Sequence, residues 1–157
     1  MFDAIINTPF GPLGLQCSQT KTESLSAIHL IEGDVVPHAN AYYAPFLKTI
    51  IKKIQSYFNK AHVIDLPLDI QGSPFQKEVW KYLCKIPVGE TRTYGECAKE
   101  LKTAARAVGM ACRTNPLPIV IPCHRIVGAK HIGGYCGQIQ GKSVSIKQWL
   151  LAHEGRT

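Results

Sequence analysis

The sequence predicts an α+β fold: a small N-terminal β-sheet with one packed helix, followed by a mainly helical C-terminal domain. Two observations predict it. Short β-prone runs alternate with turns over the first 35 residues, whereas helix-start signals and helical periodicity dominate later. The predicted domains are residues 1–66 and 67–157. A chain of 157 residues with 45% hydrophobic content is long enough for two small domains.

Three strands and one helix are predicted in the N-terminal domain. The β-prone runs are residues 4–7, 14–18 and 26–31. Apolar residues then recur at helical spacing from Tyr43 to Phe58, and Pro45 fits only the first turn of that helix. Three lysines occupy its predicted outer face: Lys48, Lys52 and Lys53. Because no catalytic constellation occurs here, this domain is expected to be structural.

Two capping boxes mark helix starts in the C-terminal domain, which is predicted to contain a helix-turn-helix. Ser73-Pro-Phe-Gln76 starts one helix, and Thr93-Tyr-Gly-Glu96 starts a second that runs to about residue 101. Thr103 is expected to cap a third helix over residues 104–114, which stops before Asn115-Pro116. The second and third helices, joined by a tight turn, form the helix-turn-helix.

The six cysteines are expected to be free thiols. No Cys-x-x-Cys pair occurs, and the spacings of the cysteines match no common zinc site. The N-terminus lacks the basic start and long apolar core of a signal peptide, so a cytoplasmic location is predicted. Thiols stay reduced in that compartment. We therefore expect no metal, and one activated thiol among the six.

Positive charge is concentrated in the second half of the chain. Residues 1–70 contain 5 basic and 6 acidic side chains, whereas residues 71–157 contain 13 basic and 5 acidic ones. This asymmetry suits a polyanionic partner. It also suits a solvated lysine surface, and charge alone leaves the two interpretations about even.

The most informative segment is Asn115 to Arg125, which reads Asn-Pro-Leu-Pro-Ile-Val-Ile-Pro-Cys-His-Arg. Its prolines and its apolar run predict a stiff, buried mount for one side chain, Cys123. A thiolate is a strong nucleophile when a base or positive charge stabilises it, and His124 and Arg125 follow directly. The alternative, a small core cysteine, fits this context poorly.

The third predicted helix carries mostly small side chains: Ala104, Ala105, Ala107, Gly109 and Ala111. Arg106 stands among them. Small residues suit either tight helix packing or close approach to a partner's surface. Helices that read the major groove use long polar side chains, and this helix offers few. The sequence therefore favours shape-based binding in the DNA minor groove.

Together, these segments resemble the O6-alkylguanine-DNA alkyltransferases over roughly residues 67–155. Eight blocks in the family's order carry the resemblance: Gly72–Trp80, Ile86–Gly89, Thr93–Gly95, Ala104–Gly109, Asn115-Pro116, Ile121–Arg125, Gly134-Tyr135 and Leu150–Gly155. The resemblance implies DNA repair by irreversible, single-turnover transfer of the alkyl group from O6-alkylguanine, and from O4-alkylthymine, to Cys123. It also implies a monomer that acts on double-stranded DNA without a cofactor or a membrane.

The resemblance also implies roles for the reacting residues. His124 activates Cys123 through a water, and Glu154 polarises the imidazole. Tyr94 presses on the neighbouring phosphate, helps to rotate the base out and donates its hydroxyl to the flipped guanine. Arg106 fills the gap that the base leaves. Further DNA contacts are expected around the helix-turn-helix, from Ala105, Arg113, Lys99 and Lys102.

The pocket residues are implied in the same way. The carbonyls of Cys123 and Ile126 receive the exocyclic amine of guanine, and the N–H of Cys136 faces O6. Tyr135 forms a wall, and Asn115 braces the turn before the cysteine. Arg125 is expected to make structural hydrogen bonds and to add positive potential near the thiolate.

Two departures from the family pattern bear on the size of the alkyl group. Gln138 replaces a glycine at the pocket mouth, which is expected to narrow the accepted range. Cys112 lies where many relatives have a larger residue, which is expected to enlarge that wall.

Three other functions compete with alkyl transfer. An alkyltransferase-like binding module would lack the nucleophile, which Cys123 supplies. A helix-turn-helix regulator leaves Cys123 and Glu154 unexplained. A cysteine hydrolase or redox enzyme would need a hydrolase signature or a partner cysteine, and neither is found.

Overall fold

The chain forms two compact units, Met1–Gln71 and Gly72–Thr157, in a computed structural model that describes residues 2–32, 44–135 and 142–155. The division comes later than the boundary expected after residue 66. The Leu25 N–H donates to the Pro67 carbonyl (3.0 Å), and the Asp69 N–H donates to the Leu25 carbonyl (2.9 Å). The expected linker therefore pairs with the N-terminal sheet and belongs to the first unit.

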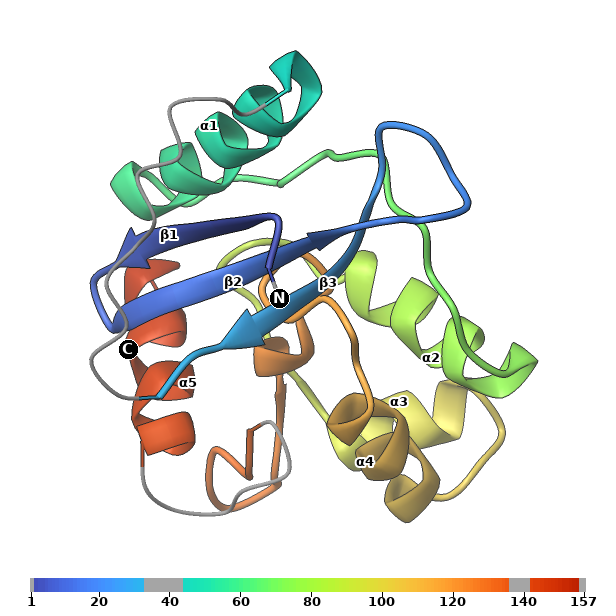
Figure 1. Cartoon of the computed structure of the whole chain (residues 1–157). Helices are drawn as coiled ribbons and strands as arrows, with labels where there is room; N and C mark the ends of the chain where they lie inside the picture. The colour runs from blue at the N-terminus through green and yellow to red at the C-terminus, as the bar shows by residue number, and fades with distance from the viewer. Residues whose placement is uncertain (1, 33–43, 136–141, 156–157) are drawn as a thin grey trace. The chain divides into compact units, whose positions relative to one another are not determined.

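The first unit contains a three-stranded antiparallel sheet in the order β1-β2-β3 (Figure 1). The strands are β1 (Ala4–Thr8), β2 (Gly11–Cys17) and β3 (Leu25–Leu30). All three predicted strands are confirmed, but β2 begins before the expected residue 14. Thr8 pairs directly with Gly11, whose φ of 118° is open to glycine and permits the tight turn between β1 and β2.

Helix α1 (Pro45–Asn59) packs on this sheet through an apolar face. Its buried residues are Leu47, Ile50, Ile54 and Tyr57. Pro45 lies in the first turn, and the three lysines of the outer face are exposed, both as predicted. Tyr43 lies outside the described residues.

The helices of the second unit are α2 (Pro74–Cys84), α3 (Tyr94–Glu100), α4 (Ala105–Arg113) and α5 (Lys142–His153). Both predicted capping boxes form, at Ser73 and at Thr93. The predicted Thr103 cap is wrong: Ala104 is the N-cap of α4, and no side chain caps it. The Thr103 N–H donates instead to the Ala98 carbonyl (2.9 Å), after Lys102 at a φ of 55°. Thr103 therefore closes the end of α3.

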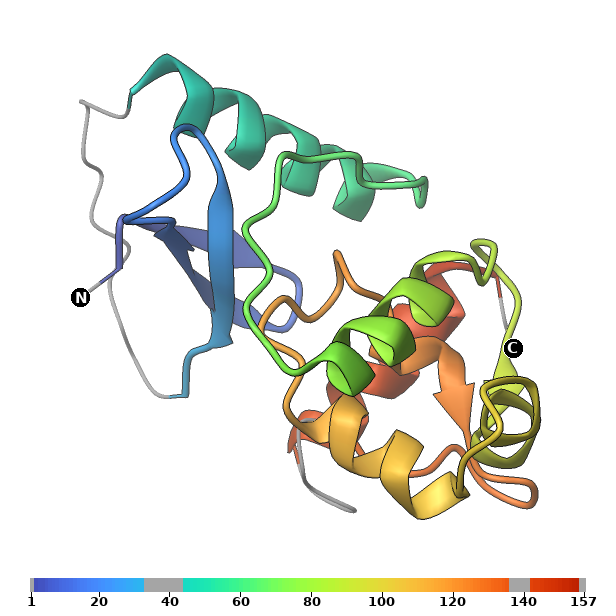
Figure 2. The same cartoon turned by 90° about the vertical axis from the view of Figure 1, so that its right-hand side faces the viewer.

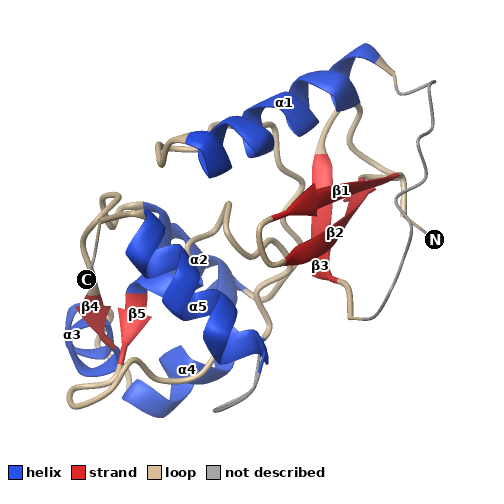
Figure 3. Ribbon diagram, turned by 90° about the vertical axis from the view of Figure 1, so that its left-hand side faces the viewer, coloured by secondary structure: helices blue, strands red, loops and turns tan. Residues whose placement is uncertain are grey.

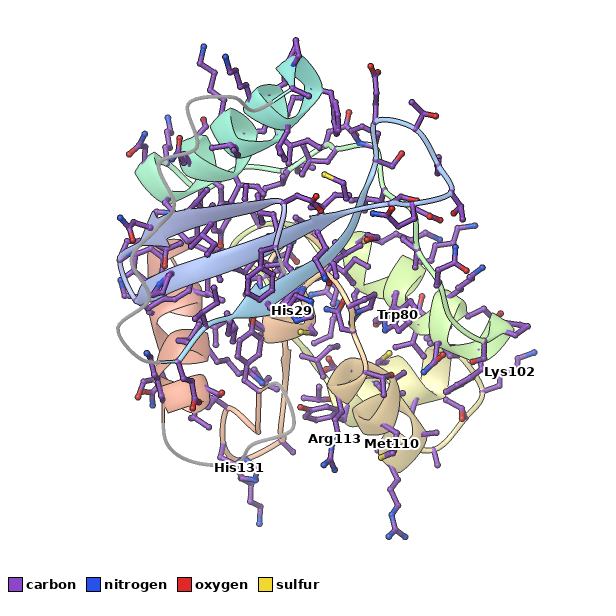
Figure 4. All side chains as sticks on the ribbon, viewed as in Figure 1. His29, Trp80, Lys102, Met110, Arg113 and His131 are labelled. Atoms are coloured by element: carbon purple, nitrogen blue, oxygen red, sulfur yellow. The ribbon has the colours of Figure 1, made fainter. Side chains whose placement is uncertain are left out.

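Helix α4 packs against α3 and is fastened to α2 at its C-terminal end. The indole N–H of Trp80, a buried residue labelled in Figure 4, donates to the Ala111 carbonyl at 2.8 Å. The Gln76 side chain donates to the Thr114 hydroxyl at 2.9 Å. These two bonds hold α2 and α4 together.

Three short elements around Cys123 are not predicted by the sequence. Strands β4 (Arg92–Thr93) and β5 (Ile126–Val127) pair in parallel, as Figure 3 shows. The 3₁₀ helix η1 (Cys123–Arg125) precedes β5 and contacts both α2 and α5. In Figure 2 this orange segment runs between the green α2 and the red α5. Elements of two or three residues are too short to produce a periodic pattern in the sequence.

Within the part of the chain that the structure describes, no helix has the length and apolar character that crossing a bilayer requires.

Candidate active site

Cys123 is held at the end of a buried, hydrogen-bonded turn. The Ile121 N–H donates to the Leu117 carbonyl (2.8 Å), which closes the turn. The Asn115 side chain donates to the Ile121 carbonyl (2.8 Å) and accepts from the Leu117 N–H (2.9 Å). Cys123 follows with 5% of its surface exposed. The segment is therefore the rigid mount that its sequence predicts, with Asn115 bracing it from both sides.

The same turn holds one residue in a strained conformation. Ile119 has a φ of 79°, which is unfavourable for a β-branched residue and costs about 1–3 kcal/mol. Its side chain is 3% exposed, so burial keeps it in place. Strain of this kind persists where the surrounding structure determines the backbone, and it is common at functional sites.

The Cys123 thiol is the nucleophile candidate, and its surroundings act on it in opposite directions. Burial raises the pKa of the thiol above its ordinary value. A hydrogen bond with the Asn115 side chain and the positive charge of Lys147 lower it. Because burial dominates, the resting sulfur is a neutral thiol, and it needs a base to become a thiolate.

His124 is that base candidate, and Glu154 fixes its tautomer. The Nε2 atom of His124 lies 2.7 Å from Oε1 of Glu154, and the imidazole is fully buried. Burial lowers the pKa of His124, so the ring is neutral. Burial works to raise the pKa of Glu154, but hydrogen bonds from His124 and Arg125 hold it at about 2, so it is ionised. A carboxylate only accepts, so Nε2 carries the proton and donates it.

The other ring nitrogen of His124 is therefore an unprotonated acceptor. Nδ1 is buried and has no hydrogen-bond partner among the residues that the structure describes. A buried acceptor without a protein partner is uncommon and calls for a functional reason. The neutral imidazole is thus oriented by Glu154 with its basic nitrogen free to take up a proton.

Arg125 pairs with Glu154 rather than pointing to solvent. Its Nη2 donates to Oε1 of Glu154 at 2.7 Å and its Nε donates to Oε2 at 3.0 Å, while Nη1 donates to the Ile86 carbonyl at 2.8 Å. Arg125 is 6% exposed, so its charge does not belong to the protein surface. It holds the carboxylate that orients His124.

Lys147 is a site residue that the sequence analysis missed. This fully buried side chain of α5 donates from Nζ to the carbonyls of Ile126 (2.6 Å) and Gly134 (3.0 Å). Burial lowers the pKa of the Lys147 ammonium to about 8, although Cys123 and Cys112 act to raise it. It remains mostly protonated at neutral pH. Lys147, not Arg125, is the cation that acts on the Cys123 sulfur.

A helical pattern could have revealed Lys147. The buried face of α5 follows helical spacing: Ser143, Ile146, Lys147, Leu150 and Leu151. Lys147 lies three residues before Leu150 and four before Leu151, which places it on the apolar stripe. A lysine in that position needs carbonyl or anionic partners.

Tyr94 lies beside the same ammonium. It is half-buried at the first position of α3, and Nζ of Lys147 lies 5.9 Å from its ring centroid. Burial raises the pKa of Tyr94 to about 12, so its hydroxyl stays protonated and can donate. Gly133, at a φ of 78°, leaves room for the ring, because a Cβ there would lie 3.0 Å from it.

The structure also describes three other predicted pocket residues: Tyr135, Cys112 and Ile126. Tyr135 is buried, and Cys112 is half-buried with its thiol pKa raised by burial. The Ile126 carbonyl already accepts from Lys147, and its second lone pair leaves it able to accept once more. Cys136 and Gln138 lie outside the described residues.

The predicted DNA-contact residues are exposed on α3, α4 and the turn between them: Lys99, Lys102, Ala105, Arg106 and Arg113. The small residues of α4 are not all explained by internal packing. A Cβ built on Gly109 would meet no atom within 4 Å. At this position the alternative of tight helix packing is therefore wrong, and the smooth face is open to a partner.

The described cysteines are free thiols, as expected: Cys17, Cys84, Cys97, Cys112 and Cys123. In the same described part of the chain, no three His, Cys, Asp or Glu side chains come together as a group able to hold a metal ion.

Known proteins are similar to this chain in both sequence and fold. Residues 74–156 match the family model described as 6-O-methylguanine DNA methyltransferase, DNA binding domain. The methylated-DNA–protein-cysteine methyltransferase of Methanosarcina mazei is 38% identical over 157 residues, covering 98% of this chain and 97% of the relative. The methylated-DNA–protein-cysteine methyltransferase of Archaeoglobus fulgidus is 44% identical over 108 residues, covering 66% of this chain and 72% of the relative.

Among solved structures, Mycobacterium tuberculosis OGT in complex with DNA is similar to this chain with a TM-score of 0.74 and 34% identity. The match covers 96% of this chain and 91% of that one. The family model, the sequence similarity and the fold all point to the same family. The chain belongs to the methylated-DNA–protein-cysteine methyltransferase family of DNA-repair proteins.

Proposed function

We propose that this chain repairs DNA by transferring the alkyl group of O6-alkylguanine to Sγ of Cys123. The observation that carries the proposal is the buried Cys123-His124 segment with Glu154. One neutral imidazole is oriented by a carboxylate, and its basic Nδ1 lies on the residue next to the thiol. Such an arrangement activates a nucleophile by taking its proton.

The proton needs a relay, because adjacent side chains rarely hydrogen-bond to each other directly. A water between Sγ and Nδ1 passes the thiol proton to His124, and Glu154 stabilises the imidazolium that results. The thiolate then attacks the alkyl carbon in line. A carbon–sulfur bond forms, the carbon–O6 bond breaks, and guanine leaves with the electron pair. Tyr94, protonated and half-buried, supplies a proton to the leaving base.

Lys147 supports the same step by charge. A thiolate in a buried site is unfavourable unless a cation compensates it. The ammonium of Lys147 acts on Cys123 from the adjacent helix and holds the carbonyls of Ile126 and Gly134. The product thioether has no easy leaving route, so each protein molecule acts once. O4-alkylthymine presents the same oxygen-bound alkyl carbon and is the second proposed substrate.

DNA is the partner, and the target base must leave the helical stack to reach Cys123. Extrusion costs a few kcal/mol, less for a poorly paired damaged base. We assign it to α4, which enters the minor groove with Arg106 in the place of the displaced nucleotide. The open face at Gly109 supports close approach of a backbone or sugar edge.

Incubation with duplex DNA that carries labelled O6-methylguanine tests the proposal. We expect one label per protein molecule, mapped by mass spectrometry to Cys123 and to no other cysteine. Cys123→Ser should transfer nothing while still binding the duplex, because a hydroxyl has almost no ionised fraction near neutral pH. Label on another cysteine, or transfer by Cys123→Ser at the wild-type rate, would show that Cys123 is not the acceptor.

A further inference from the structure

One long apolar side chain stands out on the exposed face of α4. Met110 is 57% exposed. Among the described residues, Val63 in the N-terminal unit is the other large apolar side chain with high exposure, at 75%. A single exposed apolar residue is ordinary on a protein surface. The position of Met110 within α4 is what makes it informative.

Met110 lies between two cations on one face of the helix. It follows Arg106 by four residues and precedes Arg113 by three, and residues at these spacings are neighbours on a helix surface. Figure 4 labels Met110 and Arg113, both on α4. Both arginines are exposed, and α4 contains no acidic residue.

The rest of this face is smooth. Ala105 is exposed, and the space above Gly109 is empty of other atoms within 4 Å. Arg106, Met110 and Arg113 are therefore the side chains that project from it. An apolar side chain between two cations, on a flat surface, matches the walls of the minor groove. Those walls are apolar sugar faces bordered by phosphates, and minor-groove proteins frequently bring apolar side chains into this groove.

We propose that Met110 is a DNA-contact residue, whose side chain packs against the sugar wall of the minor groove beside the nucleotide that Arg106 displaces. The inference rests on the proposed function, in which α4 enters that groove. Methionine suits the position because its flexible thioether adapts to an irregular surface. The contact adds affinity without neutralising a phosphate, so it strengthens binding to every duplex and leaves the salt dependence unchanged.

The test measures the affinity of Cys123→Ser protein for an O6-methylguanine duplex, so that no alkyl group is transferred. In that protein, Met110→Ala should weaken binding about tenfold, which corresponds to burying part of one apolar side chain. The slope of log K against log salt should stay the same, whereas Arg113→Ala should flatten it. Met110→Leu should bind within about twofold of the parent. Val63→Ala is the matched control and should change nothing.

A footprint gives an independent readout. Dilute peroxide converts an exposed methionine to its sulfoxide, and the bound duplex should protect Met110 from this oxidation. Any of three results would overturn the proposal. They are an unchanged affinity of Met110→Ala for the duplex, a flatter salt slope in that variant, and equal oxidation of Met110 with and without DNA. These outcomes are separate from failure of the proposed function, which would appear as absent label transfer by the wild-type protein.

Discussion

The two units of the chain are built around different kinds of core. The described buried residues of Met1–Gln71 are hydrophobic apart from small or neutral groups such as Ser24. The described part of Gly72–Thr157 also buries four side chains of acidic or basic residue types: His124, Arg125, Lys147 and Glu154. Unpaired charges are costly to bury, and even paired ones often stabilise no more than apolar residues would. The first core therefore relies on apolar burial, which stabilises the fold, whereas the second core buries ionic groups around the candidate active site.

The largest expected effect is on the reaction rate, from Glu154→Gln. A neutral amide no longer stabilises the imidazolium and leaves Arg125 without its carboxylate. Transfer should slow by about a hundredfold or more. The loss should be similar for duplex DNA and for free O6-benzylguanine, because both need the activated thiol.

The matched variant in the other core is Leu15→Ala, at a fully buried residue. It should lower the free energy of unfolding by about 2–5 kcal/mol. The transfer rate per folded molecule should not change. If Leu15→Ala slows transfer as much as Glu154→Gln, the contrast between the two units fails.

The buried Glu154 carboxylate should make the stability of the protein fall at acidic pH. The pKa of Glu154 is about 2 in the folded protein, and an ordinary glutamate has about 4.3. Its depressed pKa contributes about 3 kcal/mol of stability above pH ~4.3, which is lost as pH falls to about 2. The depressed pKa of buried His124 acts in the same direction, starting below pH ~6.5.

Urea unfolding at a series of pH values measures this contribution. The stability difference between the wild type and Glu154→Gln should shrink between about pH 4.3 and 2. The exposed Glu78 of α2 provides the control, since Glu78→Gln removes a carboxylate at the protein surface. A difference for Glu154→Gln that is constant across the range would contradict the ion pairing described here.

Arg106→Ala should separate base extrusion from chemistry. It should slow repair of duplex DNA by about 10- to 100-fold, in keeping with a flipping cost of a few kcal/mol. Reaction with free O6-benzylguanine should be nearly unaffected, because the free base needs no extrusion. Equal losses on both substrates would assign Arg106 to folding or to the reaction centre.

Lys147→Met should slow transfer by about tenfold at neutral pH, equivalent to about one unit in the thiol pKa. Methionine fills a similar volume but removes the ammonium that acts on Cys123. The pH–rate profile should move to higher pH, which a purely structural loss would not produce. Lys142→Met, on the exposed start of the same helix, is the control. An unshifted profile would mean that Lys147 acts only through its carbonyl bonds.

The smallest effect concerns surface charge. Each phosphate contact contributes about −0.9 to the slope of log K against log salt. Replacing Lys99, Lys102 or Arg113 with alanine should flatten the slope by about one contact and weaken all duplexes alike. The triple replacement of Lys48, Lys52 and Lys53 is the control from the N-terminal unit. A larger change from that triple variant would place the DNA surface on α1 instead.

Much of the fold could be predicted because its elements carry strong local signals. The capping boxes at Ser73 and Thr93 and the apolar stripe of α1 are confirmed. The Thr103 prediction is wrong because a threonine before a helix can serve either as the N-cap or as part of the preceding turn. The left-handed backbone conformation of Lys102 places Thr103 in the turn. The domain boundary was placed too early because the pairing of Leu68 with Leu25 is non-local.

The sequence predicts most residues of the candidate site, but it does not reveal Lys147 or several of the connections between residues. Cys123, His124 and Glu154 follow from sequence blocks, and the structure brings His124 and Glu154 together at 2.7 Å. The pairing of Arg125 with Glu154 spans 29 positions and leaves no local pattern. The burial of Lys147 is hard to predict because lysines usually lie on the protein surface. Only the helical spacing of its buried neighbours indicates that this lysine faces the core.

The fastening of α4 to α2 by Trp80 and Gln76 has a mechanical consequence. A helix that displaces a nucleotide must push against the resistance of base stacking, and a compliant helix would yield before the base did. Both bonds lie at the C-terminal end of α4, beyond Arg106, which we propose to take the place of the displaced nucleotide. They fix the C-terminal end of α4 to α2. If α4 displaces a nucleotide as proposed, the force on Arg106 passes through α4 into α2.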